Sequence, residues 1–242
     1  VGIINAVNMI DGVDGLMSGY GIVVSFIFGV LFYQSGDMGM AAMAMISAGA
    51  LIPFFMYNLV GQRSKMYLGD GGSLMIGTMM SLFVFFVLKE NSLCSLMVSR
   101  DFGLVAFTLA VLSVPVFDTL RVMTMRLKSR RSPFSPDRNH LHHMFLDLGF
   151  SHPGTAFSII LLDCMVLLAW WISYRCGASV DLQLYVVVAS ALMATFGLCI
   201  SVRMSRKRDG IFYRMLLAIG RKTHMENSGI WMKFRDMLDN RF

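Results

Sequence analysis

Residues 16–33, LMSGYGIVVSFIFGVLFY, form an apolar run that contains no charged side chain. A helix that crosses a bilayer needs about 20 predominantly apolar residues, so this run is typical of a membrane-spanning helix. Similar runs recur along the 242 residues, giving six in all: Leu16–Tyr33, Gly39–Tyr57, Gly72–Leu88, Phe102–Leu120, Gly154–Tyr174 and Leu182–Val202. Hydrophobic residues make up 56% of the chain and charged residues 15%, which excludes an ordinary soluble domain. The sequence therefore predicts an all-α, polytopic integral membrane protein with about six transmembrane helices.

The basic residues are divided unevenly between the two sides of the membrane that six crossings define. One side receives residues 1–15, 58–71, 121–153 and the tail from 203, and the other receives 34–38, 89–101 and 175–181. Of the 21 Lys and Arg residues, 18 fall on the first side and 3 on the second. Because basic loops stay in the cytoplasm, the first side is predicted to be cytoplasmic. This topology explains the net charge of +6 without a nucleic-acid partner.

The chain divides into a membrane domain, residues 1–202, and a basic cytoplasmic tail, residues 203–242. The tail mixes basic and apolar residues, as in RMSRKRDGIFYRMLLAIGRK (203–222), which suits either a helix lying on anionic lipid or a solvated tail. Trp231 would anchor the first arrangement at the membrane interface. The chain starts at Val1 without a leader, and we interpret it as a fragment of a longer protein.

Polar residues gather on the predicted cytoplasmic side. The opening segment NAVNMIDGVDGL (5–16) carries Asn5, Asn8, Asp11 and Asp14. Asp11 and Asp14 are three residues apart, so on a helical turn their carboxylates would be neighbours. Such a pair attracts a cation or a base, although capping of a glycine-rich turn would explain the same residues.

A second polar group surrounds Asp70 in YLGDGGSLMIG (67–77), at the start of the third predicted crossing. Glycines let a backbone approach a phosphate, a helix N-terminus attracts anions, and a carboxylate there binds a divalent cation. An aspartate N-cap is the alternative explanation. Asn58, at the other end of the same loop, would either bind a base edge or cap a helix.

The loop 126–145, RLKSRRSPFSPDRNHLHHMF, combines a basic run with His140, His142 and His143. Arg138 and its basic neighbours would bind phosphate oxygens, although a cytoplasmic loop carries such charges in any case. The histidines would serve as metal ligands, as hydrogen-bond partners of a diphosphate or as proton carriers. The dense arginines and the absence of a nearby Cys or HExxH pattern argue against zinc.

Other polar and thiol groups lie in or beside the predicted helices. Asp118 is one turn from Arg121, which predicts a structural ion pair. Asp163 lies in the middle of the fifth crossing, where a charge is costly, and it is interpreted as functional, protonated or paired with another helix. An ion-conducting or transporting bundle would use Asp163, but it would also distribute polar residues through the membrane. Whether Cys94 and Cys176, on the opposite side, form a disulfide is left open.

Carboxylates, asparagines, glycines, arginines and histidines thus converge on one membrane face from separate segments. Capping explains each residue by itself but does not explain why they gather. Such a set suits a divalent cation, a phosphate-bearing substrate and a partner embedded in the membrane. This combination indicates phosphoryl transfer, in which positioning and charge neutralisation lower the barrier.

The sequence resembles the polyprenyl-phosphate N-acetylhexosamine-1-phosphate transferases, glycosyltransferase family 4. The resemblance is carried, in order, by NAVNMIDGVDGL (5–16), YLGDGGSLMIG (67–77), PVFDTLRVM (115–123) and SPFSPDRNHLHH (132–143). The pattern His-Leu-His-His is similar to the bacterial branch that uses N-acetylglucosamine. Gly71 departs from the family, which commonly has Ala or Thr there, and glycine is expected to be tolerated.

The resemblance implies transfer of N-acetylglucosamine 1-phosphate from UDP-GlcNAc to the lipid undecaprenyl phosphate, with release of UMP. The reaction would be the first membrane step of O-antigen or enterobacterial common antigen synthesis, at the cytoplasmic face of the bacterial inner membrane. Mg²⁺ is the implied cofactor, with Mn²⁺ as an alternative. The implied catalytic residues are Asp11, Asp14, Asp70, His140, His142 and His143, with Asp70 and Asp14 as metal ligands. The implied substrate-binding residues are Asn5, Asn8, Asn58 and Arg138.

Three alternatives stay open beside this interpretation. Another UDP-N-acetylhexosamine would suit the same residues, because nothing in the sequence selects the sugar. A membrane zinc peptidase would explain the histidines but would leave the Asn/Asp segment and the Asp70 loop unused. The family's Asp-Asp motif belongs to an N-terminal half that this sequence lacks, so we expect the 242 residues alone to be inactive. The oligomeric state is not predicted beyond a homodimer as one expectation.

Overall fold

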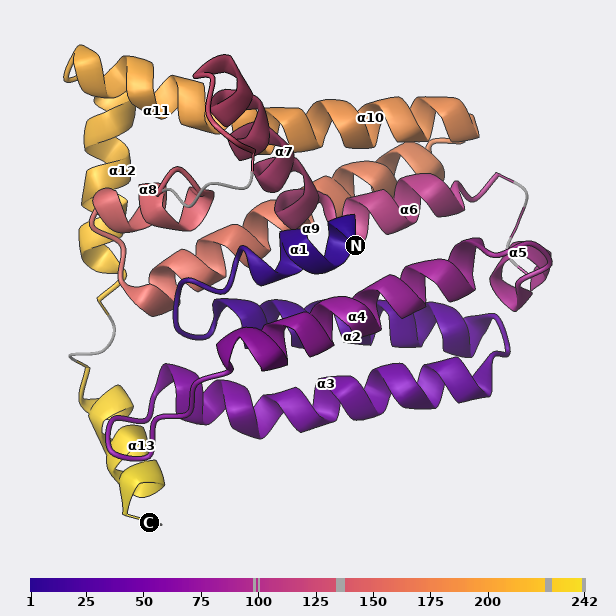
Figure 1. Ribbon diagram of the computed structural model, residues 1–242, viewed down its shortest axis with the longest axis horizontal. Helices are drawn as coiled ribbons and strands as arrows, with labels where there is room; N and C mark the ends of the chain where they lie inside the picture. The colour runs from indigo at the N-terminus through magenta and orange to yellow at the C-terminus, as the bar shows by residue number, and fades with distance from the viewer. Residues whose placement is uncertain (98, 100, 134–137, 225–227, 241–242) are drawn as a thin grey trace.

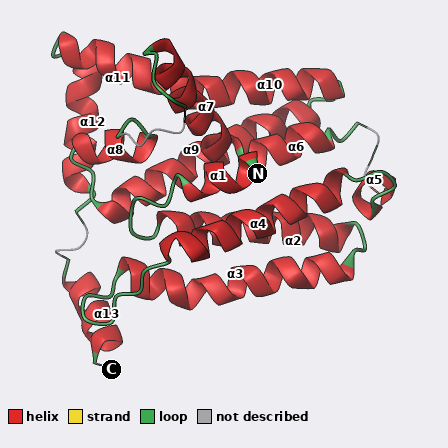
Figure 2. Ribbon diagram, viewed as in Figure 1, coloured by secondary structure: helices red, strands yellow, loops and turns green. Residues whose placement is uncertain are grey.

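The computed structural model describes residues 1–97, 99, 101–133, 138–224 and 228–240, and these residues form helices and connecting loops with no strand (Figures 1 and 2). In chain order the helices are α1 (Gly2–Asn8), α2 (Leu16–Gln34), α3 (Met38–Leu59), α4 (Gly69–Leu88), α5 (Leu93–Met97), α6 (Leu104–Val111), α7 (Ser113–Lys128), α8 (Leu141–Asp147), α9 (His152–Arg175), α10 (Val180–Leu192), the π-helical turn η1 (Met193–Gly197), α11 (Leu198–Lys207), α12 (Ile211–Lys222) and α13 (Gly229–Asp239).

Five helical stretches of the described chain are long and apolar enough to cross a membrane. They are α2, α3, α4, α9 and the continuous run α10–η1–α11. A sixth crossing is formed if α6 and α7, which are bent by 74° at the break between them, count as one broken span. The predicted all-α, polytopic fold is therefore confirmed.

The connections between the spans lie in two groups at opposite ends of the bundle (Figure 1). α5 and the turns α2–α3 and α9–α10 lie at one end. α8, α12, α13 and the α3–α4 loop lie at the other end, which we call the basic end because most Lys and Arg residues belong to its loops and helices. The two groups agree with the predicted alternation of loops, and the cytoplasmic orientation of the basic end stays a prediction.

The fourth predicted crossing, Phe102–Leu120, is not one straight helix, because it breaks between α6 and α7. Pro115 lies in the first turn of α7 and has no N–H with which to bond back across the break. Asp163 of α9 caps the new helix end. Its Oδ1 accepts hydrogen bonds from the Val114 N–H at 2.9 Å and from the Ser113 hydroxyl at 2.8 Å. Asp163 thus acts as an N-cap supplied by a neighbouring helix, which satisfies donors that the break leaves without partners.

The first residues of the chain, predicted only to lie on the cytoplasmic side of the membrane, form a helix packed within the bundle. Residues 2–8 form α1, which packs against α4 and α7 within the bundle (Figure 1). A Cβ on Gly77 of α4 would lie 3.0 Å from the Cα of Ile4, so glycine permits the close approach of α1 and α4. The loop of residues 9–15 then leads from α1 to α2 and carries Asp11 and Asp14.

Aromatic side chains join four of the helices. The ring centroid of Phe28 in α2 lies 5.7 Å from that of Phe83 in α4 and 6.0 Å from that of Phe107 in α6. The Phe107 centroid lies 5.0 Å from that of Trp170 in α9. Aromatic pairs at such separations contribute about 0.5–1.5 kcal/mol each beyond the area they bury. α2, which contributes Phe28, is the most buried of the five uninterrupted spans.

The C-terminal tail is fixed to the membrane domain at two places. The Ser151 N–H and hydroxyl donate to the Thr223 hydroxyl and carbonyl, at 3.0 and 2.7 Å, which holds the end of α12 at the α8–α9 corner. Asp239 of α13 accepts hydrogen bonds from the N–H groups of Gln62 and Ser64, both at 3.2 Å, and from the Ser64 hydroxyl at 2.7 Å. The tail, expected to lie on lipid or in solvent, therefore ties two loops of the basic end together.

Candidate active site

Asn58, at the end of α3, holds the loop of residues 9–15 in place. Its Oδ1 accepts a hydrogen bond from the Gly15 N–H at 2.6 Å, and its Nδ2 donates to the Met66 carbonyl at 2.7 Å. Gly15 has a φ of 76°, a left-handed conformation that glycine adopts without strain. Because both ends of the buried Asn58 amide are used, the structure gives this residue a positioning role. Nucleotide binding by Asn58 stays a prediction.

The loop and the first turn of α4 bring three predicted carboxylates together. Asp11 and Asp14 come from the loop, and Asp70 comes from α4. Loss of surrounding water, followed by the charges of Asp70 and Asp14, raises the pKa of Asp11 above its ordinary value. Within the described chain, the carboxylates of Asp11 and Asp70 have no hydrogen-bond or ion-pair partner. Two carboxylates without counter-charges and within electrostatic reach of each other attract a cation.

Asp14 differs from the other two carboxylates because basic side chains already surround it. Its Oδ2 lies 2.7 Å from the Lys65 Nζ and 2.8 Å from the His152 Nδ1. Lys65 belongs to the α3–α4 loop and His152 begins α9, so Asp14 joins three segments of the chain. The sequence did not single out either partner, because His152 belongs to no motif and Lys65 resembles any basic loop residue. Metal binding by Asp14 stays a prediction.

The two predicted asparagines of α1 lie near the start of α4. The Asn8 Oδ1 accepts a hydrogen bond from the hydroxyl of Ser73, which is one turn after Asp70. Asn5 lies one turn earlier in α1 and is partly buried. The structure thus places Asn8 beside the helix end that carries Asp70, while a contact of either asparagine with a substrate stays a prediction.

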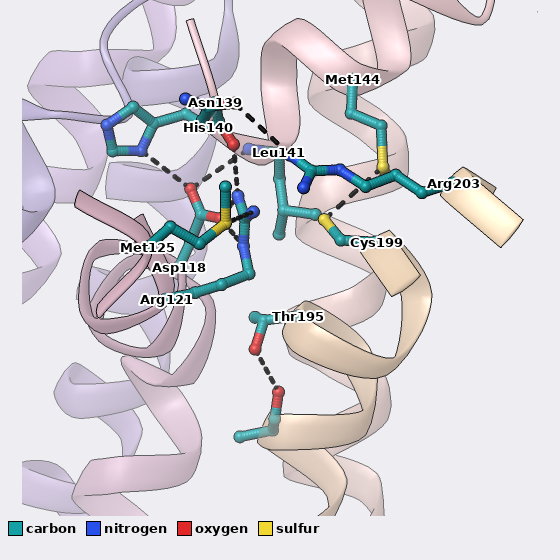
Figure 3. A network of polar contacts seen from close by, with 11 residues as sticks. Asp118, Arg121, Met125, Asn139, His140, Leu141, Met144, Thr195, Cys199 and Arg203 are labelled. Atoms are coloured by element: carbon teal, nitrogen blue, oxygen red, sulfur yellow. Dashed lines mark hydrogen bonds and ion pairs between the residues drawn. The ribbon is translucent and has the colours of Figure 1, made fainter. Parts of the chain in front are cut away.

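Asp118 of α7 anchors the histidine segment (Figure 3). Its Oδ2 lies 2.9 Å from the His140 Nδ1 and accepts the Leu141 N–H at 3.2 Å. Its Oδ1 accepts hydrogen bonds from Arg121, from Nε at 3.1 Å and from Nη2 at 2.6 Å. Arg121 Nη2 also donates to the Asn139 carbonyl at 2.5 Å. The predicted ion pair between Asp118 and Arg121 is confirmed, and it also orients His140, which the sequence did not predict.

His142 connects the histidine segment to the carboxylate loop. Its ring lies parallel to that of His140, with centroids 5.8 Å apart and 5° between the planes, and 4.2 Å from the centroid of His143. A Cβ on Gly12 would lie 3.0 Å from both Cδ2 and Cε1 of His142, so the ring packs directly on the Gly12 backbone. Burial, followed by the charges of His143 and His140, lowers the pKa of His142 to about 4. His142 is therefore neutral near pH 7.

Arg138, a predicted substrate-binding residue, lines a cavity beside the histidine segment, together with His140. This cavity has a volume of about 180 Å³, and Arg203 and Arg206 of α11 also line it. Arginine side chains grip phosphate oxygens with two parallel hydrogen bonds. The cavity therefore suits an anionic group beside the histidine segment, whereas Asp14 lines a separate cavity. Residues 134–137, part of the motif that precedes Arg138, lie outside the described residues.

The carboxylates of Asp11 and Asp70 are oxygen donors of the kind that Mg²⁺ binds. Among the described residues, no three His, Cys, Asp or Glu side chains form a group that could hold a metal ion. Mg²⁺ commonly binds one or two carboxylates, several waters and the phosphates of a substrate. Asp11 and Asp70 supply such oxygen donors and lack competing cationic partners in the described chain.

A sequence model described as Glycosyl transferase family 4 matches residues 1–88. These residues belong to that family. The family 4 segment comprises α1 to α4 and contains Asp11, Asp14, Asn58 and Asp70. The match confirms the resemblance drawn from the first two motifs, and the histidine segment lies beyond the matched residues.

Curated relatives extend the similarity beyond the family 4 segment. Undecaprenyl-phosphate alpha-N-acetylglucosaminyl 1-phosphate transferase from Yersinia pestis is 35% identical over 166 residues, which are 68% of this chain and 43% of the relative. The Escherichia coli (strain K12) protein of that name is 34% identical over 167 residues, with the same shares covered. Decaprenyl-phosphate N-acetylglucosaminephosphotransferase from Mycolicibacterium smegmatis is 36% identical over 172 residues, 66% of this chain and 42% of the relative. The alignments thus cover less than half the length of these relatives. No solved structure matches the chain significantly.

Proposed function

We propose that this chain is the part of an enzyme that transfers N-acetylglucosamine 1-phosphate from UDP-GlcNAc to undecaprenyl phosphate. An oxygen of the lipid phosphate attacks the β-phosphorus, the bond between that phosphorus and the bridging oxygen breaks, and UMP leaves. One observation carries the proposal: the carboxylate loop and the histidine segment meet where His142 packs on Gly12. The names of the relatives support a polyprenyl phosphate acceptor and N-acetylglucosamine as the sugar.

The carboxylates of Asp70 and Asp11 would hold Mg²⁺, or Mn²⁺ in its place. Asp11 takes the position first expected for Asp14, whose carboxylate is paired with Lys65 and His152. A divalent cation there neutralises the diphosphate charge that otherwise repels the attacking phosphate. Two observations support this assignment. Burial, followed by the charges of Asp70 and Asp14, raises the pKa of Asp11, and the carboxylates of Asp11 and Asp70 have no cationic partner in the described chain.

The basic end would bind the anionic parts of both substrates. The arginines beside His140 suit a phosphate group, and the apolar surface of the spanning helices suits a polyprenyl chain. By the positive-inside rule this end faces the cytoplasm of the bacterial inner membrane. The product would begin an O-antigen or enterobacterial common antigen polysaccharide. Use of another UDP-N-acetylhexosamine is the alternative, and a homodimer stays a prediction.

The first experiment measures UMP release in membranes that contain the chain, with UDP-GlcNAc, undecaprenyl phosphate and Mg²⁺. Because the alignments cover less than half of the relatives, the chain is assayed both alone and co-expressed with the N-terminal half of a full-length relative. We expect release only with co-expression, and its loss in Asp70→Asn. Asp209→Asn, an exposed aspartate in the α11–α12 turn, is the matched control and should retain activity.

Each outcome of this experiment distinguishes between interpretations. Release by the chain alone would contradict the expected need for a second segment but would support the activity. Release that is equal in Asp70→Asn and Asp209→Asn would exclude Asp70 from the chemistry. No release in either arm, with the protein present in the membrane, would refute the proposed transferase. UDP-GalNAc as the better donor would establish the alternative sugar.

A further inference from the structure

The C-terminal helix α13 forms one wall of a cavity beside the carboxylate loop. The cavity has a volume of about 270 Å³. Asp14, Lys65 and His152 line it from the membrane domain, and Trp231 and Arg235 line it from α13. These two α13 residues are therefore close to the predicted catalytic loop, although they lie more than 200 positions further along the chain.

Specific contacts fix α13 in this position. Asp239 near its end accepts three hydrogen bonds from Gln62 and Ser64 of the α3–α4 loop, the loop that also carries Lys65. At its start, the Ser228 hydroxyl accepts the Trp231 N–H at 3.3 Å and so caps the helix. The cap starts the helix, and the contacts of Asp239 with the α3–α4 loop tie its other end to the membrane domain.

The two α13 side chains that line the cavity, Trp231 and Arg235, suit the base and the phosphates of a nucleotide. In the described chain the Arg235 guanidinium has no hydrogen-bond or ion-pair partner, whereas Lys65 is engaged by Asp14. Arg235 is therefore the cation in the cavity that is free to bind an incoming anion, and arginine binds diphosphate oxygens bidentately. Trp231 adds an aromatic surface, on which nucleic-acid bases stack with about 1–3 kcal/mol each.

We propose that α13 is part of the substrate site, with Arg235 binding the diphosphate of the nucleotide sugar and Trp231 packing against its uracil ring. The inference rests on the proposed function and extends it to a segment that no motif marks. This role would also account for the contact of Asp239 with the α3–α4 loop, because that contact holds α13 beside the cavity that Asp14 lines.

The test compares two neutralising substitutions on the same helix. Arg235→Ala should raise the KM for UDP-GlcNAc roughly 10-fold or more, because a charge-assisted contact is lost, while kcat changes little. Lys233→Ala removes the same charge from an exposed position that does not line the cavity, and it should leave KM unchanged. Arg235→Lys should restore part of the affinity, which a purely structural role of the arginine would not predict.

A binding measurement tests the contact between α13 and the nucleotide without requiring turnover. UMP or UDP-GlcNAc should change the tryptophan fluorescence of the purified protein, and the change should disappear in Trp231→Phe while Trp170 and Trp171 remain. Equal KM values for Arg235→Ala and Lys233→Ala would overturn the inference even if the transferase is active. If no turnover is found at all, the proposed function fails, and a fluorescence change that is absent or unaffected by Trp231→Phe would overturn the role of α13 as well.

Discussion

The imidazole ring of His142 rests on the backbone of Gly12, with two ring carbons 3.0 Å from where a Cβ at position 12 would lie. The contact joins α8 to the loop that carries Asp11. A side chain at position 12 would have to displace a buried ring that is itself packed between His140 and His143. The absence of a side chain at position 12 is therefore a condition for the meeting of the two motifs.

Gly12→Ala is expected to destabilise the site. Overpacking of a well-packed region costs about 1–3 kcal/mol, because side chains and backbone must shift. The melting temperature in detergent should fall, and UMP release should fall with it. Gly71→Ala is the matched control, because a Cβ there meets no atom within 4 Å, and alanine in the first turn of α4 should stabilise the helix slightly. Equal melting temperatures for the two variants would show that the ring accommodates a methyl group.

The neutral state of His142 should make the protein less stable in acid. Its pKa is lowered from 6.5 to about 4 in the folded protein, so between these values the unfolded chain binds a proton that the folded chain does not. The free energy of unfolding should therefore fall as the pH decreases from about 6.5 to about 4. His142→Gln should flatten this part of the pH dependence of Tm, whereas His224→Gln, at an exposed position, should not. An unchanged pH profile in His142→Gln would contradict the assignment.

The cap that Asp163 supplies to α7 should depend on its oxygen atom rather than on its charge. Asp163→Asn retains an acceptor for the Val114 N–H and the Ser113 hydroxyl, so it should stay close to the wild type. Asp163→Ala leaves these donors without a partner and should cost about 1–2 kcal/mol, as the loss of helix caps does elsewhere. Thermal unfolding in detergent measures both. Greater destabilisation by the asparagine than by the alanine would indicate that a charge is needed at this position.

Substitution of Asp118, which forms a buried ion pair with Arg121, should destabilise the protein more than the other substitutions described above. Both partners have 2% exposed side chains, so Asp118→Ala leaves the Arg121 charge buried and should cost about 3–5 kcal/mol. The exposed pair of Asp209 with Arg214 is the control, and Asp209→Ala should change little. The monodisperse fraction after heating, measured by size-exclusion chromatography, compares the two. A similar loss in both variants would mean that burial does not strengthen the Asp118 contact.

Much of the fold and part of the site could be predicted from local patterns. The apolar runs predict the crossings, because only a long apolar helix satisfies its backbone inside a bilayer. The helix bounds differ by a few residues, and Asp70 proves to lie inside α4 rather than before it. The motifs also predict that Asp11, Asp14 and Asp70 come together, and the structure places Asp11 within electrostatic reach of both Asp14 and Asp70.

The remaining features depend on pairings that no local pattern specifies. Asp14 meets Lys65 across 51 positions, and His152 lies 138 positions from it. The break between α6 and α7 needs a cap from Asp163 on another helix, and Asp239 of α13 bonds to the distant α3–α4 loop, beside the cavity that Asp14 lines. The sequence by itself thus determined that the chain spans a membrane and which face is polar, because hydropathy and charge act over short segments. The tertiary structure decided which polar groups meet, because those contacts depend on how the helices pack.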